Sequence, residues 1–231
     1  MKTIGLIGGM SWESSLEYYR IINETVKEKL GGCHSAKCLM YSFDFYEIEQ
    51  LQHHGDWDAL TDRMIDAGNN LKQGGADFIV ICTNTMHLMA QDIEDATGLE
   101  VLHIAKIAGK SAHTLGMKKI GLLGTKFTME GSFYKDVIKD HYGIETIIPN
   151  DEDRNIIHDV IYNELVKGIF TEASRHAYVE IIQKLSEEGA EGVILGCTEI
   201  PLLVKQDDVS VPLFNTTTLH GRAAVEKALK E

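Results

Sequence analysis

The stretch GADFIVICTN at residues 75–84 decides the fold, because it is a short apolar run that follows a glycine and ends in polar residues. It aligns without a gap on GAEGVILGCT at residues 189–198, at an offset of 114 residues. The segment IGLIG at residues 4–8 recurs as IGLLG at residues 120–124, at an offset of 116. Two near-equal offsets favour two related halves, although any two buried parallel strands share short apolar runs and a glycine near the turn.

Similar apolar runs alternate with segments of helical period along the chain, which is typical of an α/β fold with parallel sheets. Strands are expected at residues 3–7, 38–43, 78–82, 101–104, 120–123, 146–148, 192–195 and 211–214. One expected helix carries a core-facing stripe made of Leu16, Tyr19, Ile22, Val26 and Leu30. A second follows Thr171 as its N-cap and ends at Gly189.

We therefore expect two pseudo-twofold-related doubly wound halves, with parallel sheets and a cleft between them. The N-terminal half covers residues 1–105 and the C-terminal half residues 106–210, while the segment of about 211–231 packs back on the first half. Ligands of such sheets bind beyond the carboxyl ends of the strands. The aligned positions Thr83 and Cys197 both lie at such ends.

Composition limits the classes of partner. Asp and Glu total 35 against 22 Lys and Arg, which gives a net charge of −13 and disfavours nucleic acid and anionic membranes. An anionic substrate would need hydrogen-bond donors in its site that overcome the repulsion from this negative charge. The four cysteines form no CxxC pair and follow no charged-then-apolar leader, so we expect no zinc site and a reducing, cytoplasmic location.

Small polar residues follow both strand ends, as Thr83-Asn84-Thr85 and Cys197-Thr198-Glu199. Such side chains and free N–H groups at the start of a helix bind carboxylates. The same dipole favours a thiolate, so Cys197 is predicted to be a base or nucleophile with a lowered pKa, unless it is an inert small hydrophobe. Two groups on opposite faces of one carbon would remove a proton on one side and return it on the other, which is racemisation.

Three segments, residues 4–11, 82–87 and 196–200, resemble the aspartate/glutamate racemase family, and the likeness covers essentially the whole chain. The subgroup most similar is that of the bacterial L-aspartate/glutamate-specific racemases. The resemblance implies a homodimeric, cofactor-independent isomerase that interconverts L- and D-aspartate or glutamate by two-base Cα proton transfer.

The family's pair of cysteines falls on Thr83 and Cys197, and Cys82 is then a structural neighbour that faces the other way. A hydroxyl ionises poorly, so Thr83 is expected to donate a proton more readily than it removes one. We expect an asymmetric enzyme in which Cys197 removes the Cα proton of the L form and reverse turnover is slow.

Other residues are expected to hold the substrate. By position, the carboxylate donors are Asn84, Thr85 and Thr198. By resemblance, the further binding residues are Met10 through its backbone, Gln52, Glu199 for the ammonium group and Lys167 for a carboxylate. His87 is expected to support the site rather than to catalyse. The ten histidines form no tight ligand pattern, and the glycine turn after residue 4 lacks GxGxxG spacing, so neither a metal nor a nucleotide is expected.

Two alternatives stay open. One is a sister reaction on the same scaffold, such as a hydantoin racemase, a maleate isomerase or an arylmalonate decarboxylase. The other is a non-catalytic protein that binds acidic amino acids.

Overall fold

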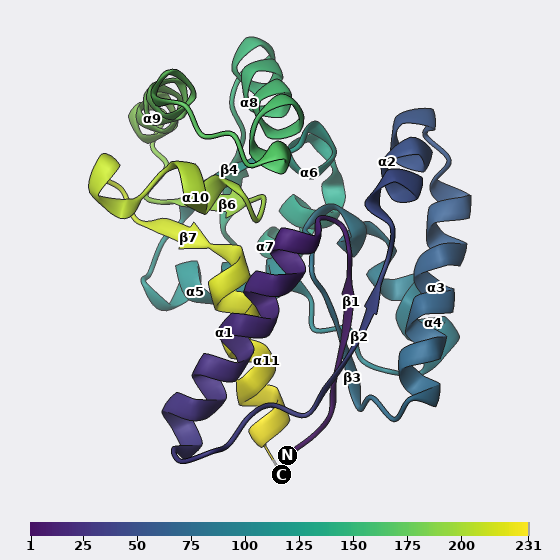
Figure 1. Ribbon diagram of the computed structural model, residues 1–231. Helices are drawn as coiled ribbons and strands as arrows, with labels where there is room; N and C mark the ends of the chain where they lie inside the picture. Colours follow the sequence, from purple (N-terminus) through teal and green to yellow (C-terminus); the bar gives the residue numbers. More distant parts are fainter. Residues whose placement is uncertain (231) are drawn as a thin grey trace. The chain divides into compact units, whose positions relative to one another are not determined.

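Two parallel sheets organise the computed structural model, which describes residues 1–230. Each sheet belongs to its own unit (Figure 1). Unit 1 consists of Met1–His103 and the chain from His220 onward, and unit 2 of Ile104–Leu219. The predicted α/β class with two parallel sheets is confirmed.

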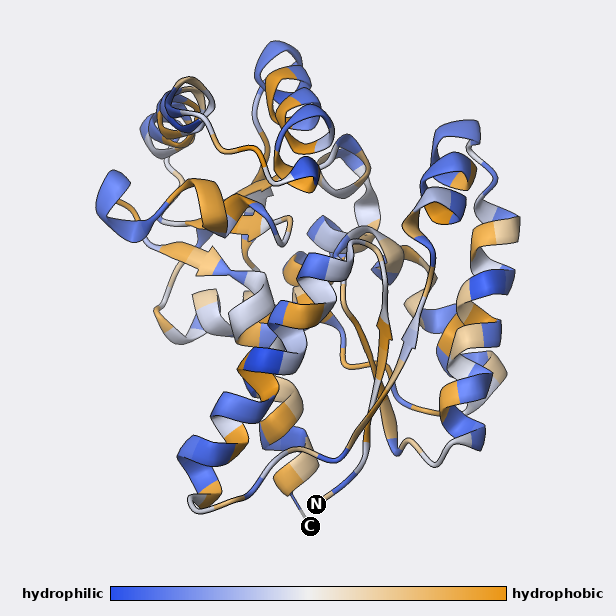
Figure 2. Ribbon diagram, viewed as in Figure 1, coloured by the Kyte–Doolittle hydropathy of each residue, from blue (hydrophilic) through white to orange (hydrophobic). Residues whose placement is uncertain are grey.

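The sheet of unit 1 has the strand order β2-β1-β3. Its strands are β1 (Ile4–Gly8), β2 (Cys38–Ser42) and β3 (Phe78–Ile81). One face packs against helices α1 (Trp12–Leu30) and α11 (Thr216–Leu229), which lie side by side in Figure 1. The other face packs against α2 (Phe45–His54), α3 (Trp57–Gln73), the 3₁₀ segment η1 (Thr85–Met89) and α4 (Ala90–Thr97). Strands β1 and β3 are buried along their whole length and contain only apolar residues and glycine, whereas β2 at the edge is partly exposed. In Figure 2 the end of β2 is accordingly pale rather than orange.

The sheet of unit 2 has the strand order β5-β4-β6-β7. Its strands are β4 (Lys119–Gly124), β5 (Glu145–Ile147), β6 (Val193–Gly196) and β7 (Leu213–Asn215). One face packs against α8 (Asp151–Asn163), α9 (Glu172–Glu187) and α10 (Ile200–Leu203). The other packs against α5 (Ile104–Thr114) and α7 (Ser132–Tyr142). The remaining short elements are α6 (Lys126–Glu130), η2 (Leu165–Lys167) and η3 (Gln206–Asp208).

The two sheets repeat one register. In unit 1, Ile7 of β1 pairs with Ile81 of β3, and in unit 2 Leu123 of β4 pairs with Leu195 of β6. These pairs are related by the sequence offsets of 116 and 114 residues. The internal similarity of the sequence therefore corresponds to equivalent strand pairings, and it makes residue 83 the counterpart of residue 197.

The turn after β1 is tightly packed against the strand end of β2. Gly9 has a φ of 83°, and a Cβ there would overlap the backbone N and O of Phe43. The Gly9 N–H donates to Ser15 Oγ at 2.8 Å, and Ser15 Oγ donates to the Ser11 carbonyl at 3.1 Å. The start of α1 is thus held against the turn by small serines.

This packing overturns the predicted core stripe of α1. Ile22 and Val26 are buried, but Leu16 and Tyr19 are 56% and 50% exposed, and Leu30 is exposed as well. The buried face is rotated toward Ser14, Ser15 and Tyr18 because only small side chains fit beside the glycine turn. The exposed residues Trp12, Leu16 and Tyr19 instead line a surface groove with Met40 of β2.

Two further segments differ in detail from their sequence patterns. The expected strand at residues 101–104 is reduced to a single bridge between Val101 and Ile79, because α5 already begins at Ile104. Strand β7 pairs with β6 of unit 2, and the chain joins unit 1 only from His220. The helix after Thr171 is confirmed, since the Thr171 hydroxyl accepts from the Ser174 N–H at 3.1 Å. Within residues 1–230, no helix has both the length and the apolar character needed to span a lipid bilayer.

We expect Gly9→Ala to destabilise the protein by about 2–4 kcal/mol, because the new Cβ meets backbone atoms that cannot move independently. Gly75→Ala is the matched control, since Gly75 also has a positive φ, of 93°, but has open space around it. The control should lose only about 1 kcal/mol, from the backbone conformation alone. Urea unfolding of both variants measures the difference, and equal losses would contradict the close packing of this turn.

Candidate active site

The strand end of β3 leads into Thr83, Asn84 and Thr85. The Cys82 N–H donates to the Ile7 carbonyl at 2.8 Å, and the chain leaves the sheet directly afterwards. Thr83 is half-buried, while Asn84 and Thr85 are buried. Cys82 packs with Tyr18 and Ile22 on the α1 face, whereas Ile79 and Ile81 pack on the opposite face, so alternation directs Thr83 away from Cys82. The expectation that Cys82 faces the other way agrees with its place in the core.

His87 binds the turn that carries Thr83. Its Nδ1 lies 2.9 Å from the Thr83 carbonyl oxygen and 3.3 Å from that of Asn84. Burial, reinforced by the neighbouring His220, lowers the pKa of His87 to about 3, so the ring is neutral at physiological pH. Its Nδ1 therefore carries the hydrogen and donates to the carbonyls.

Met10 and Gln52 lie in the buried part of unit 1. Met10 follows the Gly9 turn and belongs to the same apolar cluster as Ile7 and Ile81. Gln52 lies on α2 and is 6% exposed, and its Oε1 has no hydrogen-bond partner among residues 1–230. A buried amide oxygen without a donor is costly, so this atom is suited to accept an N–H from a bound molecule.

The strand end of β6 leads into Cys197, Thr198 and Glu199. The Cys197 thiol donates to Glu199 Oε2 at 3.0 Å, and the Thr198 hydroxyl donates to the same oxygen at 2.8 Å. Cys197 and Glu199 are both buried. The three residues thus form one hydrogen-bonded group at the carboxyl end of β6.

The predicted lowering of the Cys197 pKa is wrong for this structure. Burial, followed by the carboxylate of Glu199, raises the pKa of the Cys197 thiol well above its ordinary value. The helix that follows, α10, has only four residues and begins three positions later, at Ile200. Its dipole is too small and too distant to offset the burial and the neighbouring negative charge.

Lys167 belongs to unit 2. It is the exposed last residue of η2, and its side chain makes no hydrogen bond or ion pair with any residue in the described part of the chain. In the turn after β4, Thr125 caps α6 by accepting from the Thr128 N–H, and the backbone N–H of Lys126 donates to His158 Nδ1.

One residue near the Thr83 turn, His220, was not predicted from the sequence. His220 Nε2 lies 2.6 Å from the Leu102 carbonyl oxygen, and its Nδ1 lies 2.8 Å from Tyr18 Oη. These partners are separated by more than 100 residues along the chain, so no local spacing reveals them. Across residues 1–230, no group of three or more His, Cys, Asp or Glu side chains is arranged to hold a metal ion.

A family model described as Asp/Glu/Hydantoin racemase matches residues 7–224. The chain belongs to this family. A provisionally named Asp/Glu racemase from Yersinia pestis is 53% identical in sequence, with a TM-score of 0.93 and 100% of both chains covered. An aspartate racemase homologue from Pyrococcus horikoshii is 35% identical, with a TM-score of 0.86 and again 100% of both chains. The broad specificity amino-acid racemase RacX of Bacillus subtilis is 22% identical over 98% of each chain.

The family membership predicted from the three motifs is confirmed.

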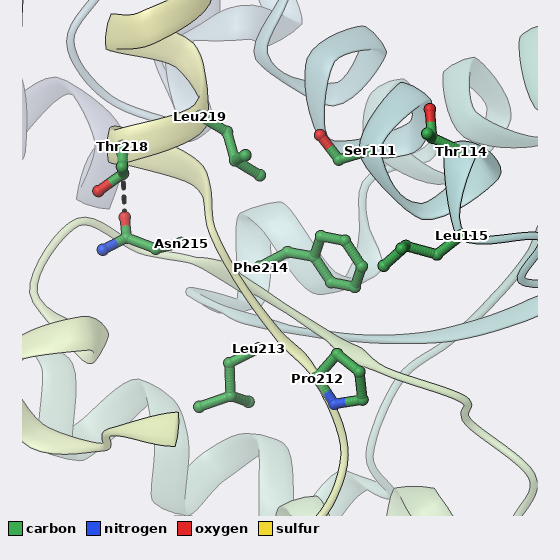
Figure 3. A pocket seen from close by; sticks show the side chains of 9 residues that line it. All are labelled: Ser111, Thr114, Leu115, Pro212, Leu213, Phe214, Asn215, Thr218 and Leu219. Carbon is green, nitrogen blue, oxygen red and sulfur yellow. Dashed lines mark hydrogen bonds between the residues drawn. The ribbon is translucent and has the colours of Figure 1, made fainter. Parts of the chain in front are cut away.

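A cavity of about 570 Å³ in unit 2 of this racemase-family protein is lined by none of the residues of those motifs (Figure 3). It lies between the end of α5 and the residues of β7 and α11, with Leu115 and Phe214 facing into it. None of the residues predicted to bind substrate lines it.

Replacing Glu199 by Gln should lower the pKa of the Cys197 thiol, because the substitution removes the negative charge but leaves the thiol buried. The alkaline rise in the rate of Cys197 alkylation should move to lower pH by about one unit. The rate is measured by mass spectrometry of the Cys197 peptide after timed iodoacetamide treatment. Thr198→Val is the control, since it removes a hydrogen bond from the same carboxylate without removing charge, and it should not lower the pKa. An unchanged profile in Glu199→Gln would contradict the electrostatic role of Glu199.

Proposed function

We propose that this racemase-family protein interconverts the L and D forms of aspartate or glutamate by proton transfer at Cα, without a cofactor. The observation that carries the proposal is the shared register of the two sheets, which makes Thr83 in unit 1 the counterpart of Cys197 in unit 2. The relatives named for aspartate and for Asp/Glu support these substrates, and RacX supports amino-acid racemisation more broadly. In this proposal the protein acts as a homodimer in the cytoplasm, with residues 1–105 and 106–210 as its halves.

Cys197 and Thr83 are the proposed acid–base pair. The thiol first passes its proton to Glu199, whose Oε2 lies 3.0 Å from Sγ. The thiolate then removes the Cα proton of the L enantiomer, and the electron pair of the broken C–H bond spreads into the substrate carboxylate. The Thr83 hydroxyl gives its proton to the opposite face of Cα. Thr83 then regains a proton from water, and Glu199 releases to the resulting hydroxide the proton that it took from Cys197, so both residues return to their starting states. Because a hydroxyl is a poor base, the reverse direction is slower.

Neutral donors hold the α-carboxylate of the substrate in this proposal, and other residues bind its remaining groups. Asn84, Thr85 and Thr198 bind the α-carboxylate, where negative charge accumulates during the reaction, and the backbone at Met10 completes this set. Gln52 Oε1 and Glu199 accept from the ammonium group. Lys167 meets the side-chain carboxylate, a role that its exposed and unpaired ammonium group leaves open to it.

Incubation of L-aspartate or L-glutamate with the protein in heavy water tests this function. We expect loss of the Cα–H proton NMR signal together with formation of the D enantiomer, detected by chiral chromatography. Cys197→Ala should lower both rates by about 10²- to 10⁴-fold, the usual contribution of a general base. Cys33→Ala is the control, because Cys33 is an exposed free cysteine. Full exchange in Cys197→Ala would refute the mechanism.

Thr83→Cys should make the rates of the two directions more nearly equal, since a thiol exchanges protons near neutral pH far more readily than a hydroxyl. Thr83→Val keeps the shape and removes the hydroxyl, and it should abolish formation of the D enantiomer while exchange of the L substrate continues. Initial rates from each enantiomer measure both effects. Loss of all exchange in both variants would instead assign Thr83 to substrate binding.

A further inference from the structure

A buried group of polar rings lies behind the turn that carries Thr83. It consists of Tyr18, His87, His103 and His220, which all belong to unit 1. The ring centroid of His87 lies 5.0 Å from that of His103 and 5.5 Å from that of His220. The ring centroids of Tyr18 and His220 are 5.6 Å apart. We call these four residues the histidine cluster.

The hydrogen bonds of the cluster have defined directions. His220 Nε2 faces the Leu102 carbonyl and therefore donates to it, so its Nδ1 accepts from the Tyr18 hydroxyl. Burial lowers the pKa of His220 to about 4, so this ring is also neutral. His87 donates through Nδ1 to the Thr83 and Asn84 carbonyls, while its Nε2 has no hydrogen-bond partner among residues 1–230. The bonds from Nδ1 thus tie the His87 ring to the turn that carries Thr83.

Burial of an imidazole costs free energy that an aliphatic side chain would not. His87 is 2% exposed, so its presence requires a compensating interaction. That interaction is the hydrogen bond from His87 Nδ1 to the carbonyl of Thr83, where the chain leaves β3. Direction of a carbonyl fixes the peptide plane, and the peptide plane restricts where the attached side chain can point.

We propose that His87 is a positioning residue, which holds the Thr83 carbonyl through Nδ1 and so aims the Thr83 hydroxyl at the substrate. The hydrogen bonds of His220 with Tyr18 and with the Leu102 carbonyl hold the His220 ring beside His87. They also hold Leu102, which lies at the end of the first segment of unit 1. This role rests on the function proposed above, since it concerns the half of the reaction that Thr83 serves.

The test compares two variants of nearly equal size. His87→Asn retains an N–H close to the position of Nδ1, and His87→Leu removes the donor, so both lose the imidazole but only one loses the hydrogen bond. The readout is the ratio of D enantiomer formed to deuterium gained by recovered L substrate in heavy water. This ratio reports how often Thr83, rather than return from Cys197, protonates the intermediate.

We expect His87→Leu to lower the ratio by at least about tenfold, because misplacement of a reacting group by 1 Å can cost about 10²-fold. His87→Asn should stay within about threefold of the parent protein. A general loss of folded protein would lower both rates together and leave the ratio unchanged. Equal ratios in the two variants would overturn the proposal, whether both are lowered or both are normal. If the unaltered protein shows no exchange, the proposed function itself fails.

A measurement on the unaltered protein guards against variants that fail to fold. Long-range ¹H–¹⁵N NMR of the histidine rings distinguishes the two neutral tautomers. A neutral His87 protonated on Nδ1 at pH 7 supports the proposed hydrogen bond, and a ring protonated on Nε2 overturns it.

Discussion

The hydrogen-bonded register between the first and third strands of each sheet determines where the polar turns begin. In unit 2 this register depends on two glycines, because a Cβ at Gly124 would lie 2.8 Å from the Gly196 carbonyl oxygen and a Cβ at Gly196 would lie 2.7 Å from that of Leu123. Thr128 of α6 packs over both positions. A slip of one residue would turn Cys197 to the opposite face of the sheet. The position of Cys197 at this strand end is therefore a consequence of strand pairing.

Charge limits how such turns can bind an acidic amino acid. The protein has a net charge of −13, and burial keeps His87 and His220, behind the Thr83 turn, uncharged. At the other turn, Glu199 adds a buried negative charge beside Cys197. Binding of a carboxylate would thus depend on oriented N–H and O–H dipoles, which act strongly where water is excluded.

The sequence predicted the sheets well, because a strand buried on both faces must be a continuous apolar run. It also identified both polar turns, since the segments around Thr83 and Cys197 resemble each other residue by residue. It failed for α1, where the spacing of apolar residues predicts burial of Leu16 and Tyr19, because the helix is rotated by its contact with the turn at Gly9. It failed for the pKa of Cys197, because burial and the contact with Glu199 are properties of the folded chain.

The hydrogen bond from Tyr18 to His220 could not be predicted from the sequence, because the two residues are 202 positions apart and neither lies in a recognisable motif.

The two turns share a backbone plan but give their reacting groups opposite surroundings. At Thr83 a neutral imidazole donates to the backbone carbonyls of the turn. At Cys197 a carboxylate accepts directly from the thiol. Cys82 cannot replace Thr83, because its sulfur is buried with Tyr18 on the other face of the sheet, where burial raises its pKa further. A hydroxyl that stays protonated and a thiol with a nearby proton acceptor are suited to different directions of proton transfer. In the proposed reaction, asymmetry between the two half-reactions would therefore follow from the turns themselves.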